Sequence, residues 1–298
     1  MGAFFYLIAM KNIIITGATS GIGFETALDL ASRGWKIGIA WRNEEKGLAV
    51  IEQLRQKSKN NNISGYFCDL SSFESIRNCS ENIKKDFPVI DVLINNAGTW
   101  ETQFTETADG IEQMFMVNFL APVYFSKLLH PQLRASDKAR VVMVSSAAHM
   151  MGKINKDDPE SRNKFKHIRA YGNSKLNILL ATKLLAADWA TDNIKVNALH
   201  PGVVNTRLFD KFPGFLKGLT KLITISPKKG AQTSIYLAAE PEGGLVSGKY
   251  FAKSRQKMAS ANAENSENIE WISELLNQYL SKNLKRLNKQ QSDLSQIK

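Results

Sequence analysis

The sequence predicts an α/β protein with a single doubly wound domain, in which a central parallel sheet is flanked by helices. Short apolar runs alternate with amphipathic stretches between residues 12 and 280, as expected for repeated strand–helix–strand units. The apolar runs are continuous rather than alternating, which is typical of strands covered on both faces. No Pro-, Gly- or Ser-rich linker and no repeat of solenoid length interrupts this order, so one domain over 12–280 is expected.

The expected strands and helices alternate along the chain. Within the second helix, Leu48, Ile51 and Leu54 are spaced to share one face, and Pro227 suits the first turn of the last helix. The strands are expected over 12–16, 36–41, 65–68, 89–95, 140–145, 195–199 and 250–251. The helices are expected over 24–33, 44–57, 73–86, 114–133, 171–189 and 226–239.

The two ends of the chain are expected to lie outside this domain. Residues 1–11 are interpreted as an N-terminal extension, whose apolar run 1–9 is far shorter than the roughly 20 residues that span a bilayer. The run also lacks the basic start and cleavage site of a signal peptide. It is an extension, a weak membrane-touching segment, or a wrongly assigned start with Met10 as the true first residue. Residues 281–298 are polar and weakly patterned, and a disordered tail is expected there.

Composition and charge restrict the classes of partner. The net charge is +11, but the 39 Lys and Arg residues are spread along the chain, so a solvated basic surface is favoured over an anionic partner. The basic segment 282–289 lacks interleaved aromatics, and we expect no nucleic-acid binding. Cys68 and Cys79 form neither a metal-type pair nor a disulfide framework. We therefore expect no bound metal, no transmembrane segment and a cytoplasmic protein, with peripheral membrane contact as an alternative.

A glycine-rich turn, Thr16-Gly17-Ala18-Thr19-Ser20-Gly21-Ile22-Gly23, lies between the first expected strand and the first expected helix. Glycines at this place allow a tight turn and a close approach of the backbone to a pyrophosphate. The helix start adds unpaired N–H groups and the positive end of its dipole. Because glycine turns are common, it is the position between strand and helix that favours nucleotide binding over a plain turn.

The T-G-x-x-x-G-x-G spacing of this turn resembles that of the short-chain dehydrogenase/reductase family. Asn95-Asn96-Ala97-Gly98 matches the family's N-N-A-G motif, Tyr171 and Lys175 match its Y-x-x-x-K motif, and Pro201-Gly202 matches its late P-G turn. These motifs occur in the family's order over most of the chain. The resemblance implies a Rossmann-type fold and an oxidoreductase that interconverts an alcohol and a carbonyl by hydride transfer with a nicotinamide cofactor.

Arg42 stands at the tip of the second expected strand, where many dinucleotide enzymes have an acid that holds the ribose hydroxyls. Its guanidinium suits a 2′-phosphate, and the resemblance points the same way, because NADP-preferring members carry Arg here. We therefore expect NADP(H) to be preferred over NAD(H), with a plain surface arginine as the alternative.

The resemblance also assigns the remaining cofactor contacts. Asp69, followed by Leu70, is expected to meet the adenine amino group, although a turn or N-cap aspartate is nearly as well supported. Asn95, Ala97 and Gly98 are expected beneath the adenosine ribose, where Asn95 could instead tie neighbouring strands together. The full cofactor set is Gly17, Thr19, Ser20, Gly21, Ile22, Gly23, Arg42, Asp69, Leu70, Asn95, Ala97, Gly98, Tyr171, Lys175, Pro201, Gly202, Val204 and Thr206.

Tyr171 and Lys175 are four positions apart at the start of an expected helix and share one face. A neighbouring ammonium favours the phenolate and lowers the pKa of a tyrosine, which could then give or take the alcohol proton as the hydride moves. The resemblance adds that Lys175 holds the nicotinamide ribose hydroxyls. Tyr171 is thus the expected acid/base and Lys175 its partner.

Two more residues complete the expected catalytic set. Alignment with the family places Ser146, rather than Ser145, beside the substrate oxygen. Asn118 lies among apolar helical neighbours and must find hydrogen bonds. It is a helix-kink asparagine or, by resemblance, the holder of a water that links Lys175 to solvent, and the two roles are compatible. The histidines at 149 and 200 lack a metal-ligand constellation and are not acid/base candidates.

Longer strings resemble the retinol-dehydrogenase-like branch of the family. They occupy 145–149 with 152–154, 200–206, 230–234, 246–251 and 270–276. This resemblance implies lipophilic aldehydes, ketones, retinoid-like molecules or their alcohols as substrates. The chain departs from the branch in lacking a full membrane-anchor helix before the cofactor domain, which weakens a claim of retinoid turnover in a membrane. A second departure lies near Asn177, where Ala is expected.

Two segments near the expected site differ in character. Residues 153–169 form a polar insertion rich in charge between Ser146 and Tyr171. Residues 206–224 are rich in Leu and Phe and are expected to form a substrate lid. A helix packed on the core or an oligomer contact is the alternative for the lid segment.

Three functions compete. A working oxidoreductase is favoured because Asn118, Ser146, Tyr171 and Lys175 are all present, whereas a catalytically idle NADP-binding sensor or scaffold has no need of all four. An isomerase or epimerase of the same fold is disfavoured by the short chain and by the P-G-x-x-x-T continuation to Thr206. The expected partner is a small lipophilic substrate. The resemblance also suggests a homo-oligomer, although some members of the branch stay monomeric.

Overall fold

The computed structural model describes residues 10–202 and 225–296 and contains an eight-stranded sheet. Its strand order is β3-β2-β1-β4-β5-β6-β7-β8, with β1 to β7 parallel and β8 antiparallel to β7. The strands are β1 Asn12–Thr16, β2 Lys36–Trp41, β3 Ile63–Phe67, β4 Val92–Asn95, β5 Arg140–Val144, β6 Lys195–His200, β7 Tyr250–Ala252 and β8 Arg255–Lys257. The order changes direction between β1 and β4, which is where open α/β sheets bind ligands.

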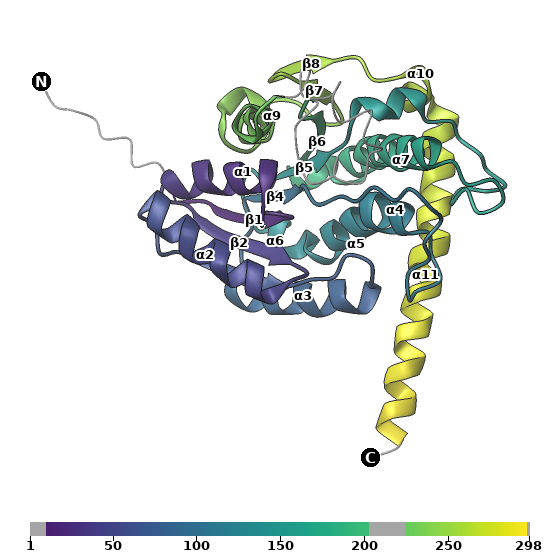
Figure 1. The fold of residues 1–298 in the computed structure, drawn as a ribbon, viewed down its shortest axis with the longest axis horizontal. Helices are drawn as coiled ribbons and strands as arrows, with labels where there is room; N and C mark the ends of the chain where they lie inside the picture. Colours follow the sequence, from purple (N-terminus) through teal and green to yellow (C-terminus); the bar gives the residue numbers. More distant parts are fainter. Residues whose placement is uncertain (1–9, 203–224, 297–298) are drawn as a thin grey trace, which may run out of the picture.

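Helices cover both faces of this sheet (Figure 1). On one face lie α1 Gly21–Ser32, α2 Glu44–Ser58 and α9 Pro227–Ala239. On the other lie α3 Phe73–Asp86, α4 Gln113–Phe115, α5 Ala121–Leu128, α6 His130–Arg134, α7 His167–Asp188, α10 Ala261–Glu264 and α11 Ser266–Gln296. Ile13 and Ile15 of β1 pack toward the first group and Ile14 toward the second. Burial on both faces explains why the strands read as continuous apolar runs.

The predicted α/β fold, with its central parallel sheet flanked by helices, is confirmed. The structure adds β8, which the sequence did not reveal. Its residues Arg255–Lys257 are all polar and exposed, so no apolar pattern marked a strand. The connection from β7 passes through Lys253 and Ser254 at φ 53° and 56°, without the glycine that usually signals such a turn.

The single helix predicted over 114–133 is corrected to four shorter pieces. Between α4 and α5 the chain forms a π-helix, Met116–Leu120, which carries Asn118. α5 ends at Leu128 and α6 begins at His130, followed by Pro131. Proline has no N–H to donate to an earlier carbonyl, so the α-helical ladder is interrupted there. The apolar periodicity continued through both breaks and therefore concealed them.

α7 begins earlier than predicted, at His167 rather than at Tyr171. Tyr171 therefore lies in the second turn of the helix, and Lys175 lies one turn further along. Between α7 and β5 the chain forms the short 3₁₀ helix η2, Ala147–Met151. The insertion 153–169 connects η2 to α7 and protrudes at one end of the molecule (Figure 1).

The C-terminal end also differs from expectation. A disordered tail was expected over 281–298, whereas the backbone of α11 is helical up to Gln296 (Figure 1). The stretch 266–296 contains no Gly or Pro and is rich in Leu, Lys, Gln and Glu, which are good helix formers. Polarity alone was therefore a poor guide to disorder here.

Two expected segments cannot be compared with the structure. Residues 1–9 of the N-terminal extension and the expected lid 206–224 lie outside the described residues. In the part of the chain that is described, no helix is long and apolar enough to cross a membrane.

Candidate active site

The candidate residues gather at the carboxyl ends of four strands. The glycine turn follows β1, residues 95–98 close β4, Ser145 and Ser146 follow β5, and Pro201 follows β6. These strands are parallel neighbours, so their carboxyl ends meet at one edge of the sheet. The fold thus brings together segments that are far apart in the sequence.

The glycine turn is closed so tightly that side chains do not fit. Gly17 and Gly21 have φ values of +68° and +59°, in the left-handed region that favours glycine. A Cβ on Gly17 would lie 2.8 Å from the Cα of Ala97, and a Cβ on Gly23 would lie 2.3 Å from the carbonyl oxygen of Gly17. The strand–turn–helix unit therefore has the backbone shape that a diphosphate can approach closely.

Asn96 holds the glycine turn against the end of β4, and the predicted site did not include it. Its Nδ2 donates hydrogen bonds to the carbonyl oxygens of Thr16 and Gly17, both at 3.0 Å. In return, Thr16 Oγ1 accepts the N–H groups of Asn96 and Ala97 at 3.1 Å each. The signal was present in the N-N-A-G motif, from which only the first, third and fourth residues were chosen.

Several polar groups near the turn fit a bound dinucleotide. Ser20 precedes α1 but makes no capping hydrogen bond with its side chain, and the first turn of α1 has no acidic residue. The helix start therefore keeps N–H groups and a hydroxyl for an anion. Asn95 donates from Nδ2 to Ser126 Oγ at 3.0 Å, which ties β4 to α5. Its buried Oδ1 has no hydrogen-bond partner among the described residues.

Arg42 is exposed directly after β2, beside Asn43, whose side chain caps α2 by accepting the N–H of Lys46 at 2.8 Å. Gly47 and Gly65 leave room for the Trp41 ring, because a Cβ on either would lie within 2.1 Å of it. The strand end that carries Arg42 is therefore well fixed. No ion pair with Arg42 is found in the described ranges, so its guanidinium can take an anionic ligand.

Asp69 forms the turn that was considered as its alternative role. Its Oδ1 accepts the backbone N–H of Ser71 at 2.9 Å and the Ser71 hydroxyl at 2.7 Å. Leu70 packs against the main core cluster. The expected contact of Asp69 with adenine stays a prediction.

Tyr171, Ser146 and Lys175 converge beyond the end of β5. The buried Tyr171 hydroxyl is hydrogen-bonded to the Ser146 side chain. Ser146 Oγ also accepts the N–H of Ala148 at 3.2 Å, which caps η2 and fixes the serine. Lys175 Nζ donates to the carbonyl oxygen of Val144 at 3.1 Å and lies 5.7 Å from the centroid of the Tyr171 ring.

Burial dominates the titration of this pair. Desolvation raises the pKa of Tyr171 to about 12, against which the hydrogen bond with Ser146 acts. Desolvation likewise lowers the pKa of Lys175 to about 8. Burial therefore has the largest effect on the pKa of Tyr171, and the expected lowering of that pKa by the Lys175 ammonium stays a prediction. A protonated Tyr171 at neutral pH suits proton donation to a carbonyl oxygen.

Ser145 and Asn118 hold the surrounding backbone. Ser145 Oγ donates to the carbonyl oxygen of Lys175 at 2.7 Å, so Ser145 supports α7 while Ser146 faces Tyr171. Asn118 Nδ2 donates to the carbonyl oxygen of Thr99 and to Ser174 Oγ, and its Oδ1 accepts the N–H of Thr99 at 2.7 Å. These bonds match the helix-kink role, and the water-holding role stays a prediction.

Lys175 has unused hydrogen-bonding capacity on the side that faces Gly98. Its buried ammonium has three N–H donors, of which the described residues accept one, at Val144. A Cβ on Gly98 would lie 3.3 Å from Nζ and 3.1 Å from Asn118 Oδ1. The absence of a side chain at Gly98 therefore keeps space beside the lysine.

Two histidines fix the loop that carries Ser146. His149 is buried, with Nδ1 2.7 Å from the carbonyl oxygen of Ser146 and Nε2 3.2 Å from the backbone nitrogen of Ser260. Since Ser260 N–H can only donate, Nε2 accepts and Nδ1 carries the proton in a neutral ring. His200 Nδ1 likewise accepts the N–H of Ala147 at 3.2 Å. Both rings have structural roles, in agreement with their exclusion as acid/base candidates.

These histidines predict that the protein loses stability in mild acid. Burial lowers the pKa of His200 to about 4 and also lowers that of His149. The unfolded state therefore binds more protons between about pH 6.5 and pH 4, and stability falls as the pH decreases through that range. We expect the His200 contribution to the free energy of unfolding to fall by about 1 to 2 kcal/mol between pH 7.5 and pH 5, measured by urea unfolding. A His200→Asn variant should lose that part of the pH dependence, and an unchanged slope would contradict the assignment.

An aromatic wall, which the sequence did not reveal, stands beside Tyr171. The Trp100 ring lies 4.5 Å from the Tyr171 ring and 5.7 Å from that of His167, measured between centroids. Phe165 from the insertion packs against the same cluster and contacts Phe104 edge to face. Trp100 follows the N-N-A-G-T string directly, but no periodicity pointed to its packing on Tyr171.

The structure describes only the first part of the expected contact at β6. Gly202 has φ +97°, and a Cβ there would lie 2.6 Å from Cδ1 of Ile225. Val204, Thr206 and the expected lid lie outside the described residues. Within the described ranges, no group of three His, Cys, Asp or Glu side chains is placed to hold a metal.

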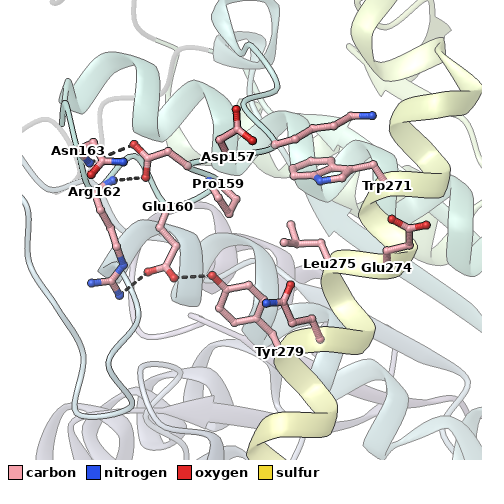
Figure 2. A pocket seen from close by; sticks show the side chains of 12 residues that line it. Asp157, Pro159, Glu160, Arg162, Asn163, Trp271, Glu274, Leu275 and Tyr279 are labelled. Carbon is pink, nitrogen blue, oxygen red and sulfur yellow. Dashed lines mark hydrogen bonds and ion pairs between the residues drawn. The ribbon is translucent and has the colours of Figure 1, made fainter.

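A separate cavity of about 430 Å³ lies between the insertion and α11 (Figure 2). It is lined by charged and polar side chains around Glu160 and by Trp271, Leu275 and Tyr279 of α11. None of the candidate catalytic or cofactor residues lines it. This cavity therefore lies where the insertion meets α11 and is distinct from the candidate active site.

The sequence of this chain is similar to those of known dehydrogenases. The family model for short chain dehydrogenase matches residues 11–214. Retinol dehydrogenase 13 of Homo sapiens is 39% identical over 267 residues, covering 86% of this chain and 80% of that protein. Retinol dehydrogenase 12 of Mus musculus is 36% identical over 270 residues, covering 87% and 83%.

Solved structures share the fold. A putative uncharacterized protein from Mycobacterium paratuberculosis aligns with a TM-score of 0.74 at 28% identity, covering 90% of this chain and 92% of that one. The Pseudomonas aeruginosa RhlG/NADP complex aligns with a TM-score of 0.67 at 24% identity, covering 84% and 97%. The matched family model and the relatives make this protein an oxidoreductase acting on CH–OH groups. The chain belongs to the short-chain dehydrogenase/reductase family, in its retinol-dehydrogenase-like branch.

Proposed function

We propose that this protein is an NADP(H)-dependent oxidoreductase that interconverts a lipophilic alcohol and its aldehyde or ketone, with Tyr171 as the acid/base. The observation that carries the proposal is the buried Tyr171 hydroxyl, hydrogen-bonded to Ser146 and one helical turn from Lys175. This group stands at the same sheet edge as the glycine turn. Proton transfer and dinucleotide binding can therefore occur side by side.

The reduction can be followed residue by residue. The Ser146 and Tyr171 hydroxyls hold the substrate carbonyl oxygen by hydrogen bonds. NADPH held by the glycine turn and by Lys175 would provide the hydride for the carbonyl carbon. As negative charge develops on the oxygen, Tyr171 transfers its phenolic proton there, so that one hydride and one proton give the alcohol. The Lys175 ammonium favours the resulting phenolate. Asn118 bonds to the Thr99 backbone and to the hydroxyl of Ser174, the residue before Lys175.

The cofactor residues divide into four groups in this proposal. The turn residues Gly17, Thr19, Ser20, Gly21, Ile22 and Gly23 bind the diphosphate at the start of α1. Asp69, Leu70, Asn95, Ala97 and Gly98 surround the adenosine, and Tyr171, Lys175, Pro201 and Gly202 surround the nicotinamide half. The cofactor contacts expected of Val204 and Thr206 stay predictions, because both lie outside the described residues. Arg42 binds the 2′-phosphate. Arg42, rather than an acid that would hold a ribose hydroxyl, directly follows β2, and this supports NADP(H) over NAD(H).

The substrate class rests on the aromatic wall and on the relatives. Trp100 and Phe165 provide an apolar surface beside Tyr171, which favours a lipophilic carbonyl compound over a sugar-like one. Relatives named retinol dehydrogenase support the same class. We propose a cytoplasmic setting, with peripheral membrane contact as the alternative, and leave homo-oligomer formation as an expectation from the family.

The test is NADPH consumption with a panel of lipophilic aldehydes and ketones, with NADH in parallel. Turnover with NADPH supports the proposal and begins to define the substrate. Tight NADPH binding without turnover across aliphatic, aromatic and isoprenoid carbonyls would favour the idle sensor or scaffold instead.

A further inference from the structure

The insertion 153–169 is fixed to the body of the protein by the buried carboxylate of Glu160 (Figure 2). One Glu160 oxygen accepts a hydrogen bond from the Tyr279 hydroxyl of α11. The other accepts the backbone N–H of Glu112 at 2.7 Å and an N–H of Arg162 at 2.8 Å. Three segments that are distant in sequence meet on one carboxylate, so the insertion has a defined position.

Beside this junction the molecule exposes apolar side chains. Met150 is 69% exposed, Met151 53% and Ile168 48%. Met151 and Ile168 line one open pocket of about 500 Å³ together with Phe165. The end of η2 packs closely on α7, because a Cβ on Gly152 would lie 2.8 Å from the carbonyl oxygen of Gly172. We call Met150, Met151 and Ile168 the apolar tip.

Cations surround the apolar tip. Lys166 and Arg169 line the same pocket as Met151 and Ile168, and Lys153 and Lys164 are exposed nearby in the chain. The stretch 161–169 contains no acidic residue. The acids of the insertion instead line the cavity against α11, where Glu160 is paired with Arg162 (Figure 2). The acids of the insertion thus lie toward α11, together with Lys156 and Arg162, whereas Lys166 and Arg169 lie at the tip pocket.

The apolar tip lies close to the candidate active site. His167, which lines the tip pocket, contacts the Trp100 ring, and Trp100 contacts Tyr171. Phe165 belongs both to the tip pocket and to the aromatic wall. A lipophilic molecule at the tip is therefore separated from Tyr171 by a short row of aromatic rings.

We propose that the apolar tip docks on a membrane surface that contains anionic lipids. Met150, Met151 and Ile168 enter the headgroup region, and the four cations bind lipid phosphates and carboxylates. A second copy of this chain suits the surface less well, since it would bring the same cations against one another. This proposal develops the peripheral membrane contact named as the alternative setting under the proposed function. Because docking needs no turnover, its test is independent of the test of the reaction.

The test is co-sedimentation of the full-length protein with phosphatidylcholine vesicles, with and without phosphatidylserine. The wild-type protein is expected to bind the anionic vesicles at least about tenfold more tightly than the neutral ones, and to dissociate from them as salt is raised. Met151→Glu and Ile168→Glu should each weaken binding to anionic vesicles at least about fivefold, and Lys166→Glu by a similar factor.

Two matched controls distinguish this surface from the rest of the molecule. Leu48→Glu on α2 alters an exposed apolar side chain of similar size, and Lys85→Glu on α3 makes the same charge reversal elsewhere. Both are expected to bind vesicles like the wild type. All variants should keep the wild-type affinity for NADPH, measured by fluorescence titration, so that a folding defect is recognised.

Three results would overturn the proposal. In the first, the wild-type protein does not bind anionic vesicles. In the second, the tip variants bind these vesicles as tightly as Leu48→Glu does. In the third, the tip variants instead convert a dimer into a monomer in sedimentation velocity experiments, without any vesicle binding, which would assign the surface to a second copy.

Discussion

Replacement of Tyr171 by Phe is expected to lower kcat for carbonyl reduction by about 10²- to 10⁴-fold, while the affinity for NADPH stays near that of the wild type. The change removes only the phenolic oxygen, which is hydrogen-bonded to Ser146 and is the proton donor in the proposed reaction. The ring would still pack against Trp100. Steady-state NADPH oxidation and a binding titration measure the two quantities separately.

Tyr124 offers a matched control for this change. It is buried in α5, and its hydroxyl has no hydrogen-bond partner among the residues that the structure describes. Tyr124→Phe should leave kcat and NADPH binding unchanged. If Tyr171→Phe retained wild-type kcat, or if Tyr124→Phe lost as much activity, Tyr171 would not be the acid/base.

Replacement of Arg42 by Asp is expected to raise the KM for NADPH by about 10²-fold and to leave the KM for NADH equal or lower. The guanidinium would be lost from the 2′-phosphate and replaced by a carboxylate that repels it. The same carboxylate can accept the ribose hydroxyls of NADH. Kinetics with both cofactors and one substrate reveal the change in preference.

The control for this variant is Arg255→Asp on β8, which makes the same change at another exposed arginine. It should leave both KM values unaltered. Arg42 would be a plain surface arginine if the wild-type enzyme used NADH and NADPH equally well. The same would follow if Arg42→Asp left the ratio of the two KM values unchanged.

Much of the fold could be predicted because its signals are local. The apolar runs at 36–41 and the helical pattern at 73–86 coincide with β2 and α3. The predicted elements were wrong where the hydrogen bonding or the tertiary packing did not follow the pattern of apolar residues. Apolar residues continue through the π-helix at Asn118, so the change of hydrogen bonding there leaves no trace in the sequence. β8 consists of exposed polar residues and is held by its pairing with β7.

The site was predictable to the extent that its residues belong to short motifs. The sequence places Gly17 and Ser146 at strand ends and Lys175 on a helix, and the structure brings all three to one sheet edge. The pKa of Tyr171 was not predictable, because it depends on burial by residues such as Trp100 from another part of the chain. The Glu160 junction with Tyr279 joins positions 119 residues apart and carries no sequence pattern.

The most direct test of the central claim is to follow the hydride itself. The enzyme would be given NADPH deuterated at C4 of the nicotinamide ring and a lipophilic aldehyde on which it turns over, and the product would be analysed by mass spectrometry. We expect one deuterium at the carbinol carbon of the alcohol, from one face of the nicotinamide only, with transfer lost in Tyr171→Phe. Alcohol formed without deuterium from either face, or the same transfer rate in Tyr171→Phe, would contradict hydride transfer assisted by Tyr171.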